Sequence, residues 1–305
     1  MLQNKVHRRI LVIKHGALGD IVQALDAFAS LRAGNPHAHI ALMTSPVFLS
    51  LARMMPWFDE VIVDPRAGPL NLAAAWRIRQ YFRQDWSVIV DMQCSSRTLN
   101  YFAHFVLSNM RWIGTAPGCS DPLPDFTGVN NRDRMVKSAE MAGGISQTPD
   151  ISWLVNGAAQ TEDLGVMIND KQYAVIVPGC SLAKPQKRWP ADMFAAIGNE
   201  LVSRGFEIVL VGTADDREAV NAVLAASPDA INLCGKTNLV TLARLLGGAA
   251  FVIGNDSGPM FLAAQTGVPS LMIMGPDTDP TMSAPKGAEA SWLQGAPISE
   301  VSAAA

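Results

Sequence analysis

Residues Ile10–Leu25 read ILVIKHGALGDIVQAL and set the pattern for the whole chain. They begin with four consecutive apolar residues, which is typical of a strand buried on both faces of a parallel sheet. A short loop with Gly16 and Gly19 follows, and Asp20 opens an apolar helical spacing that predicts one helix reaching about Leu31. Strand, glycine-containing loop and helix in this order indicate the first βα unit of an open α/β sheet.

The same alternation continues over the first half of the chain. A long loop rich in proline and glycine is expected over residues 115–131, and loops of this length inside a domain are usually functional. Residues 143–171 are weakly patterned, and we place the domain boundary there, giving domains 1–155 and 156–305. Further strands are expected at 39–43, 61–63, 87–90 and 110–114, and helices at 46–54, 71–82 and 133–142.

The second half restarts with the apolar strand Ala174–Val177. The chain is therefore expected to form two Rossmann-like domains, each with a parallel sheet, that face one another across a cleft. In open α/β sheets ligands bind at the carboxyl ends of the strands. Strands are expected at 208–211, 231–233, 251–253 and 270–274, and helices at 190–203, 215–226, 239–246 and 259–266.

Composition narrows the classes of function. The 305 residues are 49% hydrophobic and 17% charged, with a net charge of -3, so a strongly basic nucleic-acid binder is disfavoured. Residues 1–155 hold 15 basic and 12 acidic side chains, and residues 156–305 hold 9 and 15, so the halves carry +3 and -6. The positive half permits an anionic ligand. The four cysteines show no CxxC spacing, which favours reduced thiols over a zinc site.

No stretch of the sequence predicts a membrane span or a secretion signal. The apolar run Ile10–Ile13 is too short for a signal-peptide core, and no segment approaches 18 uninterrupted apolar residues. We expect a cytoplasmic protein. Contact with a membrane face is left open, although no strong amphipathic basic helix is evident.

Three loops that follow buried strands hold the candidate functional residues. In the first, Gly16–Asp20, the fingerprint GxGxxG is absent, and Asp20 suits either a helix cap or a general base. The second, Pro178–Pro190, places Lys184, Lys187 and Arg188 just before a helix, which suits a phosphate but equally a solvated basic loop.

The third loop, Gly254–Met260, has five turn-forming or polar residues in succession. Because capping needs only one of them, a ligand loop is favoured. Asp277 and Asp279 form a DxD pair among prolines and a glycine, which favours a turn with aspartate caps over a metal site.

These loops together resemble glycosyltransferase family 9, the bacterial lipopolysaccharide heptosyltransferases. The matching segments are ILVIKHGALGDIVQAL at 10–25, VDMQCSSR at 90–97, VPGCSLAKPQKRWP at 177–190 and the region 252–280 with GNDSGPM and GPDTDP. The resemblance implies a GT-B fold with an N-terminal acceptor-binding domain and a C-terminal donor-binding domain. It implies an inverting transferase that uses an ADP-sugar, typically ADP-heptose, without a cofactor or a metal. The implied acceptor is an anionic, lipid-linked inner-core saccharide with Kdo sugars.

The resemblance also assigns roles to residues. Asp20 matches the catalytic base, and Lys187 matches the lysine that contacts the donor phosphates. The donor-binding set implied is Lys187, Arg188, Asp216, Asp256, Ser257 and Gly258, and the acceptor-binding set is Gly19, Gln93 and Arg97. The first candidates for contacts with carboxylates or phosphates of the acceptor are Arg66, Arg97, Arg111 and Arg132, and at least half of these are expected to have no such role.

Two residues depart from the family pattern. Phe261 stands where the family has a histidine, which removes one donor to the departing phosphate. Cys94 replaces a glycine in the motif that contains Gln93. Two alternatives therefore stay open: a catalytically silent nucleotide- or carbohydrate-binding protein, and a nucleotide-sugar epimerase of the same fold.

Overall fold

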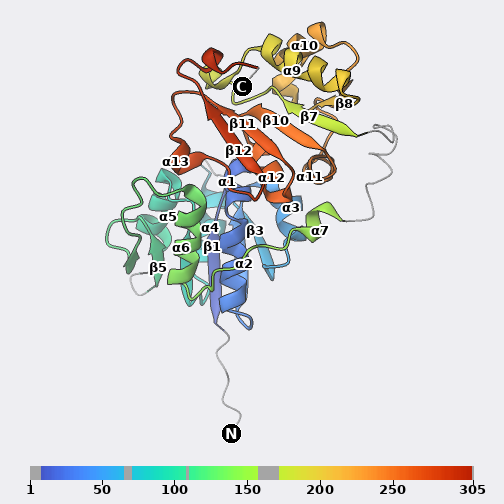
Figure 1. The fold of residues 1–305 in the computed structure, drawn as a ribbon. Helices are drawn as coiled ribbons and strands as arrows, with labels where there is room; N and C mark the ends of the chain where they lie inside the picture. The colour runs from blue at the N-terminus through green and yellow to red at the C-terminus, as the bar shows by residue number, and fades with distance from the viewer. Residues whose placement is uncertain (1–7, 65–70, 108–109, 157–171, 304–305) are drawn as a thin grey trace. The chain divides into compact units, whose positions relative to one another are not determined.

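The computed structural model describes residues 8–64, 71–107, 110–156 and 172–303 (Figure 1). The chain divides into two compact units, Met1–Asp150 and Ile151–Ala305. The predicted boundary lies a few residues farther on, after residue 155. The residues between form α7 (Ser152–Val155), which packs against α11 (Leu239–Gly247) of the second unit.

The first unit is built on a six-stranded parallel sheet with the order β3-β2-β1-β4-β5-β6. In its centre Val12 of β1 pairs with Leu42 of β2 on one side and with Val90 of β4 on the other. The predicted strands are confirmed, with ends that differ by at most two residues. The strands are β1 (Arg9–Ile13), β2 (His39–Thr44), β3 (Glu60–Val63), β4 (Val88–Asp91), β5 (Trp112–Gly114) and the short β6 (Asp121–Pro122).

The helix predicted after the first strand is split into two in the structure. It ends at Gln23 and restarts at Leu25, and the N–H of Ala24 bonds to Ile21 O and Val22 O. Apolar positions of both helices face the core, so the apolar spacing contains no signal for the break. The helices of the unit are α1 (Leu18–Gln23), α2 (Leu25–Gly34), α3 (Leu49–Met54), α4 (Leu72–Phe82), α5 (Ser96–Phe105) and α6 (Asn131–Met141).

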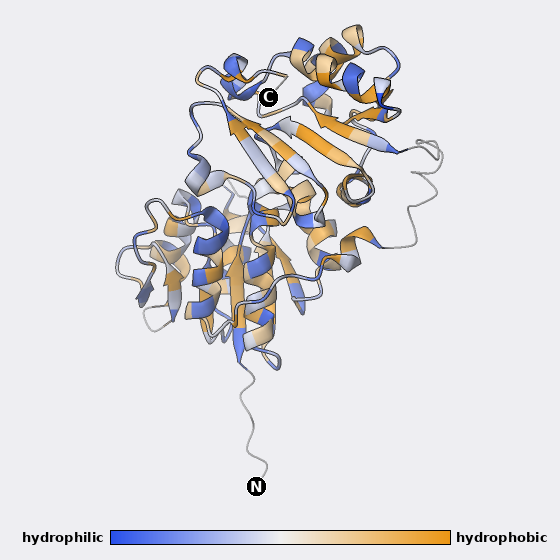
Figure 2. Cartoon of the chain, viewed as in Figure 1, coloured by the Kyte–Doolittle hydropathy of each residue, from blue (hydrophilic) through white to orange (hydrophobic). Residues whose placement is uncertain are grey.

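Large apolar side chains fill the space between this sheet and its helices. Phe82 and Trp112 are fully buried, and their rings lie 6.1 Å apart. Figure 2 shows the strands as the most apolar segments, as expected for a sheet covered on both faces. Each such buried side chain stabilises the fold by about 1.5–3 kcal/mol.

The second unit repeats the plan with the order β12-β11-β10-β7-β8-β9. The strand β12 was not predicted, because it lies at the edge of the sheet, is half exposed and has the mixed sequence ASWLQ. The strands are β7 (Tyr173–Val177), β8 (Glu207–Leu210), β9 (Ile231–Asn232), β10 (Phe251–Asn255), β11 (Ser270–Met274) and β12 (Ala290–Gln294). The main helices are α9 (Ala191–Ser203), α10 (Arg217–Ala226), α11, α12 (Gly258–Thr266) and the short α13 (Pro280–Ser283).

In both sheets the direction of chain progression reverses between two central strands, β1 and β4 in the first and β7 and β10 in the second. Loops diverge at such a switch point and leave a crevice at the carboxyl ends of the strands, where ligands bind. The fold therefore predicts one ligand-binding edge in each unit. Within the described part of the chain, no helix is long and apolar enough to cross a membrane.

Candidate active site

A cavity of about 170 Å³ lies at the switch point of the first sheet, beside the ends of β1 and β4. Its wall combines charged, polar and apolar side chains, as expected for a site that binds a polar molecule with a defined orientation. The lining residues are Lys14, Asp20, Met92, Gln93, Cys94, Leu123, Phe126, Asn131, Arg134, Met135 and Ser138.

Asp20 occupies the helix-cap position that the sequence allowed, and it also lies on the wall of the cavity. Its Oδ2 accepts the N–H of Ala17 at 3.2 Å and so caps α1, and the side chain also lines the cavity. The turn before it requires glycine, because Gly16 has a φ of +69° and a Cβ there would lie 2.5 Å from Ile21. Gly19 is buried within α1, and its carbonyl accepts the side-chain amide of Gln23.

Lys14 is a candidate site residue that sequence reasoning missed. Lys14 directly follows β1, and its side chain is buried and lines the cavity with Asp20. The ammonium donates to Met92 O at 3.2 Å. Burial lowers the pKa of Lys14, and the nearby carboxylate of Asp20 partly opposes that shift. A lysine directly after four apolar residues was the available signal.

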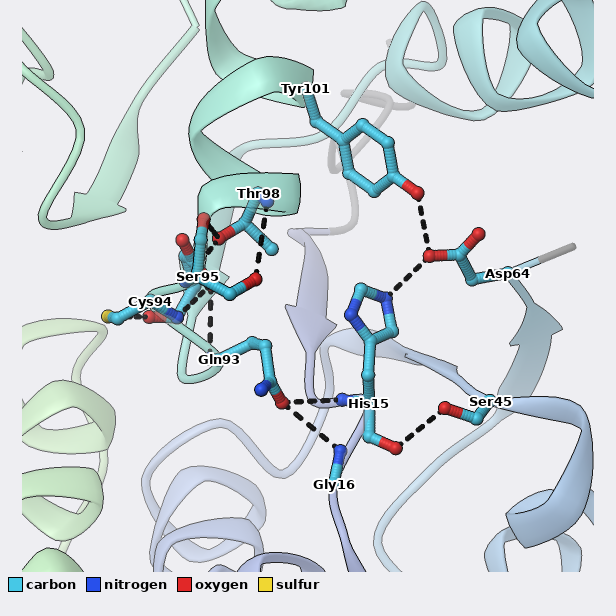
Figure 3. A network of polar contacts seen from close by, with 10 residues as sticks. His15, Gly16, Ser45, Asp64, Gln93, Cys94, Ser95, Thr98 and Tyr101 are labelled. Carbon is cyan, nitrogen blue, oxygen red and sulfur yellow. Dashed lines mark hydrogen bonds and ion pairs between the residues drawn. The ribbon is translucent and has the colours of Figure 1, made fainter. Parts of the chain in front are cut away.

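Gln93 fastens the loop that leads to Asp20. Its Oε1 accepts the backbone N–H of His15 at 2.9 Å and of Gly16 at 3.1 Å (Figure 3). The same side chain lines the cavity, so its predicted contact with an acceptor remains compatible with this position.

The side chain of Asp91 fixes the turn at Cys94. The carboxylate of Asp91 accepts the N–H of Gln93 at 3.0 Å and of Cys94 at 2.9 Å, while the thiol of Cys94 donates to Asp91 O. Cys94 has a φ of +46°, in the region that favours glycine. Burial, with the adjacent Asp91, raises the pKa of Cys94 to about 11, so the thiol is neutral at physiological pH and is a weak nucleophile. All four cysteines are free.

A buried polar cluster stabilises the start of the loop that leads to Asp20 (Figure 3). His15 Nε2 lies 2.9 Å from Asp64 Oδ2, and the hydroxyl of Tyr101 donates to the same oxygen at 2.7 Å. All three side chains are buried, and the cluster joins the ends of β1 and β3 to α5. Burial and the bond to Asp64 raise the pKa of Tyr101. The sequence contains no pattern that links these three positions.

The arginines named as acceptor candidates divide into two groups. Arg111 forms a bidentate pair with Asp121, and Arg132 pairs with Asp26, so both have structural partners. Arg97 is half-buried on α5 beside the Tyr101 hydroxyl and does not line the cavity. Arg66 lies outside the described residues.

In the second unit, an ion pair joins the loops after β7 and β10. Lys187 Nζ contacts Asp256 Oδ2, and Thr278 Oγ1 donates to the same oxygen at 2.8 Å. The side chains of Lys187 and Asp256 are only 12% and 8% exposed. Lys187 is therefore not a freely solvated cation, and the reading of this segment as a plain basic loop is wrong at this residue.

Asn255, which belongs to the third candidate loop, joins the same two loops. Its amide donates to Pro178 O at 2.7 Å, and its carbonyl oxygen accepts the N–H of Trp189 at 2.9 Å. The side chain is fully buried.

Two polar atoms at this edge lack hydrogen-bond partners among the described residues: Ser257 Oγ and Arg188 Nε, both buried. Ser257 is the N-cap of α12 but makes no side-chain cap, and Gly258 is the first residue of that helix. A helix N-terminus with an unused hydroxyl and guanidinium nitrogen suits an anionic group.

Asp216 follows β8, the next strand of the sheet. Its Oδ2 accepts the N–H and the hydroxyl of Thr213, both at 2.8 Å. It packs so closely on Gly179 that a Cβ there would lie 2.2 Å from the Asp216 side chain. The six predicted donor residues thus lie in the loops after three adjacent strands, β10, β7 and β8.

Phe261 and the DxD pair also have defined places in this unit. Phe261 lies on α12 and is only 8% exposed, so its ring is part of the packing there. Asp279 caps α13 through the N–H of Thr281, and Asp277 contacts Gln186. The interpretation of this DxD pair as a turn with an aspartate cap is confirmed.

Comparison with known proteins decides the family. The model of glycosyltransferase family 9 (heptosyltransferase) matches residues 141–298. The chain belongs to this family. Lipooligosaccharide heptosyltransferase 2 of Haemophilus influenzae is 26% identical over 93% of this chain and 88% of its own length. Lipopolysaccharide heptosyltransferase 2 of Escherichia coli is 25% identical over 88% and 83%.

Solved structures agree on the fold. A family 9 glycosyl transferase from Veillonella parvula has a TM-score of 0.79 at 22% identity, covering 94% of this chain and 86% of its own. E. coli ADP-heptose lps heptosyltransferase II has a TM-score of 0.78 at 20% identity, covering 97% and 95%. The two-domain α/β architecture is GT-B, as the sequence predicted.

Family membership also separates the alternatives. A UDP-GlcNAc 2-epimerase from Methanocaldococcus jannaschii shares the fold with a TM-score of 0.55 at 10% identity, covering 87% of this chain and 83% of its own, a likeness of fold alone. The curated relatives over most of the chain are heptosyltransferases. This glycosyltransferase is accordingly an enzyme, and neither the epimerase nor the silent-protein alternative is favoured.

Proposed function

We propose that the enzyme transfers heptose from ADP-heptose to the inner core of a lipopolysaccharide, or to a related bacterial glycan, with inversion at the anomeric carbon. The observation that carries the proposal is Asp20, a carboxylate on the wall of a cavity at the switch point of the first sheet. The names of the relatives and family membership support the donor and the acceptor class.

In the proposed reaction Asp20 accepts the proton of the acceptor hydroxyl. That oxygen forms a bond to the anomeric carbon of heptose while the bond from this carbon to the diphosphate oxygen breaks, and ADP leaves. Positioned proton transfer of this kind contributes typically 10²–10⁴-fold to the rate. The bond from Ala17 N–H fixes the orientation of the carboxylate, which lowers the cost of aligning it.

The second unit stabilises the departing ADP. Arg188 and the N-terminus of α12 at Ser257 and Gly258 offer donors to phosphate oxygens. The ammonium group of Lys187 contacts the diphosphate while it stays paired with Asp256. Asp216 contacts the sugar or the ribose of the donor. Because Phe261 cannot donate a hydrogen bond to the phosphate, Lys187 and Arg188 must stabilise more of the negative charge on the leaving ADP.

The acceptor class also implies where the enzyme works. A lipid-linked saccharide with acidic sugars is held by a bilayer, so we infer that the enzyme is cytoplasmic and acts at the inner face of the inner membrane. Gln93, Gly19 and Arg97 are the proposed acceptor contacts, of which Gln93 lines the cavity with Asp20.

The donor assignment is tested by the melting temperature of the protein with ADP, UDP, GDP or CMP. A ligand at 100 times its Kd stabilises the folded state by about 2.7 kcal/mol, which shifts the melting temperature by several degrees. We expect the shift with ADP only. An equal shift with UDP or GDP, or none with any nucleotide, contradicts an ADP-sugar donor.

The phosphate role of Lys187 is tested by ADP titration calorimetry of Lys187→Ala. Loss of one charged contact is expected to weaken binding at least about tenfold. Because removal of Lys187 leaves Asp256 as an unpaired buried charge, Lys187→Arg serves as a second variant that keeps the charge and the fold. Lys236→Ala, which removes an exposed lysine of the same unit, is the matched control. Unchanged ADP affinity in Lys187→Ala would remove Lys187 from the donor site.

A further inference from the structure

Helix α4 exposes large apolar side chains on the side that faces away from the core. Its inner face, with Ala74, Ile78 and Phe82, is buried against the first sheet. On the outer face Leu72 is 80% exposed and Trp76 is 62% exposed. Two such side chains one helical turn apart are an apolar feature that packing of this unit does not explain.

The charges on the same helix are all positive. Arg77 and Arg79 on α4 and Arg83 at its C-cap are exposed, and α4 contains no acidic residue; the nearest in sequence is Asp85. None of the three arginines forms an ion pair with any residue in the described ranges.

Leu72, Trp76, Arg79 and Arg83 follow the spacing i, i+4, i+7, i+11 and therefore lie along one side of the helix. We call these four residues the α4 ridge. Because α4 connects two parallel strands of one sheet, it runs antiparallel to them, and its first turn lies toward their carboxyl ends. Leu72 and Trp76 are thus toward the edge of the unit that holds Asp20.

We propose that the α4 ridge docks the enzyme on an anionic lipid bilayer. Tryptophan and leucine enter the interfacial region, and the arginines remain at the level of the negatively charged headgroups. A second copy of the chain is a poorer occupant, because an aromatic side chain and a leucine cover roughly a few hundred Å², whereas a stable protein interface needs about 800 Å² from each partner.

The proposal rests on the proposed function for its purpose, which is to bring the active site to a lipid-linked acceptor. Lipid binding itself needs neither donor nor acceptor. The two proposals are therefore tested separately: binding to vesicles without any saccharide tests the ridge, and ADP binding tests the donor site.

The experiment measures co-sedimentation of the full chain with vesicles of phosphatidylcholine, with and without 30 mol% phosphatidylglycerol (about one lipid in three, enough for a negative surface). We expect binding only to the anionic vesicles, and weaker binding as salt is raised. Arg79→Gln/Arg83→Gln is expected to weaken binding by about fivefold per arginine. Trp76→Ser is expected to weaken it at least about tenfold through lost apolar contact.

Matched controls separate the ridge from general charge and exposure. Arg53→Gln/Arg217→Gln changes the net charge equally at exposed arginines of α3 and α10, and Trp292→Ser removes the partly exposed tryptophan of β12. All variants are expected to bind ADP like the parent. The proposal would be overturned if the parent did not bind anionic vesicles, or if the control variants lost as much vesicle binding as the ridge variants. A dimer of the parent that dissociates in Trp76→Ser would also overturn it.

Discussion

Cys94 holds a left-handed backbone conformation on the wall of the cavity that contains Asp20. For a residue with a Cβ this conformation costs about 1–2 kcal/mol. It persists because Asp91 accepts the N–H groups of Gln93 and Cys94 and fixes the turn. Backbone strain of this kind is often concentrated at functional sites.

Replacing Cys94 with glycine is expected to raise the free energy of unfolding or leave it unchanged. Relief of the strained φ is partly offset by the greater freedom of glycine in the unfolded chain, about 0.4–1 kcal/mol, so the net gain is about 0–1.6 kcal/mol. Urea unfolding measures it. Cys234→Gly, at a half-buried cysteine with ordinary φ, is the control and is expected to lose stability. A comparable loss in Cys94→Gly contradicts the account.

For single residues, the sequence predicts the candidates that lie in recognisable motifs. It does not predict buried polar residues whose role depends on their contacts in the folded structure. Asp20 and Lys187 could be proposed because short loops after apolar strands have a defined place in an α/β fold. Lys14 and Asp64 were missed, because each is a polar residue that directly follows an apolar strand. Only three-dimensional contacts show that Lys14 faces a cavity and that Asp64 pairs with His15.

The cluster of His15, Asp64 and Tyr101 connects three elements, β1, β3 and α5, beneath the loop that carries Asp20. Tyr101→Phe removes the hydroxyl that donates to the buried carboxylate of Asp64. Hydrogen bonds to charged groups contribute about 1.5–3 kcal/mol, so the free energy of unfolding is expected to fall by that amount. Denaturant unfolding at pH 7 is the measurement.

Tyr81→Phe provides the comparison for that variant, since Tyr81 is half-buried and its hydroxyl has no hydrogen bond with the described residues. Its unfolding free energy is expected to change by less than about 0.5 kcal/mol. If both tyrosine variants behave alike, the cluster does not stabilise the loop in the way proposed here.

At the scale of elements, the central strands of both sheets could be predicted, because they are buried on both faces and appear in the sequence as continuous apolar runs. The half-exposed edge strand β12 has no such run. The α4 ridge could not be predicted from the sequence, because leucine and tryptophan are residue types that usually occupy the core face of a helix. The structure shows that other residues of α4 fill the core.

For the whole molecule, the two sheets have equivalent strand orders, and most candidate residues of each lie in loops that follow the carboxyl ends of its strands. Repetition of βα units predicted this architecture, since the right-handed crossover of such units leaves few alternatives. The pairing of Lys187 with Asp256 and the packing of Asp216 on Gly179 depend on loop conformations that strand patterns do not specify.

The most direct test of the central claim is heptose transfer by the parent and by Asp20→Asn. Purified enzyme is mixed with ADP-heptose and an inner-core acceptor that bears Kdo, and the glycosylated product is followed by mass spectrometry. Asparagine keeps an oxygen that accepts the Ala17 N–H but cannot take a proton, so the fold and the affinity for ADP are expected to be unchanged. The account predicts product with the parent enzyme and a rate about 10²–10⁴-fold lower with Asp20→Asn. Transfer at the parent rate by Asp20→Asn, or no transfer from ADP-heptose by the parent, would contradict it.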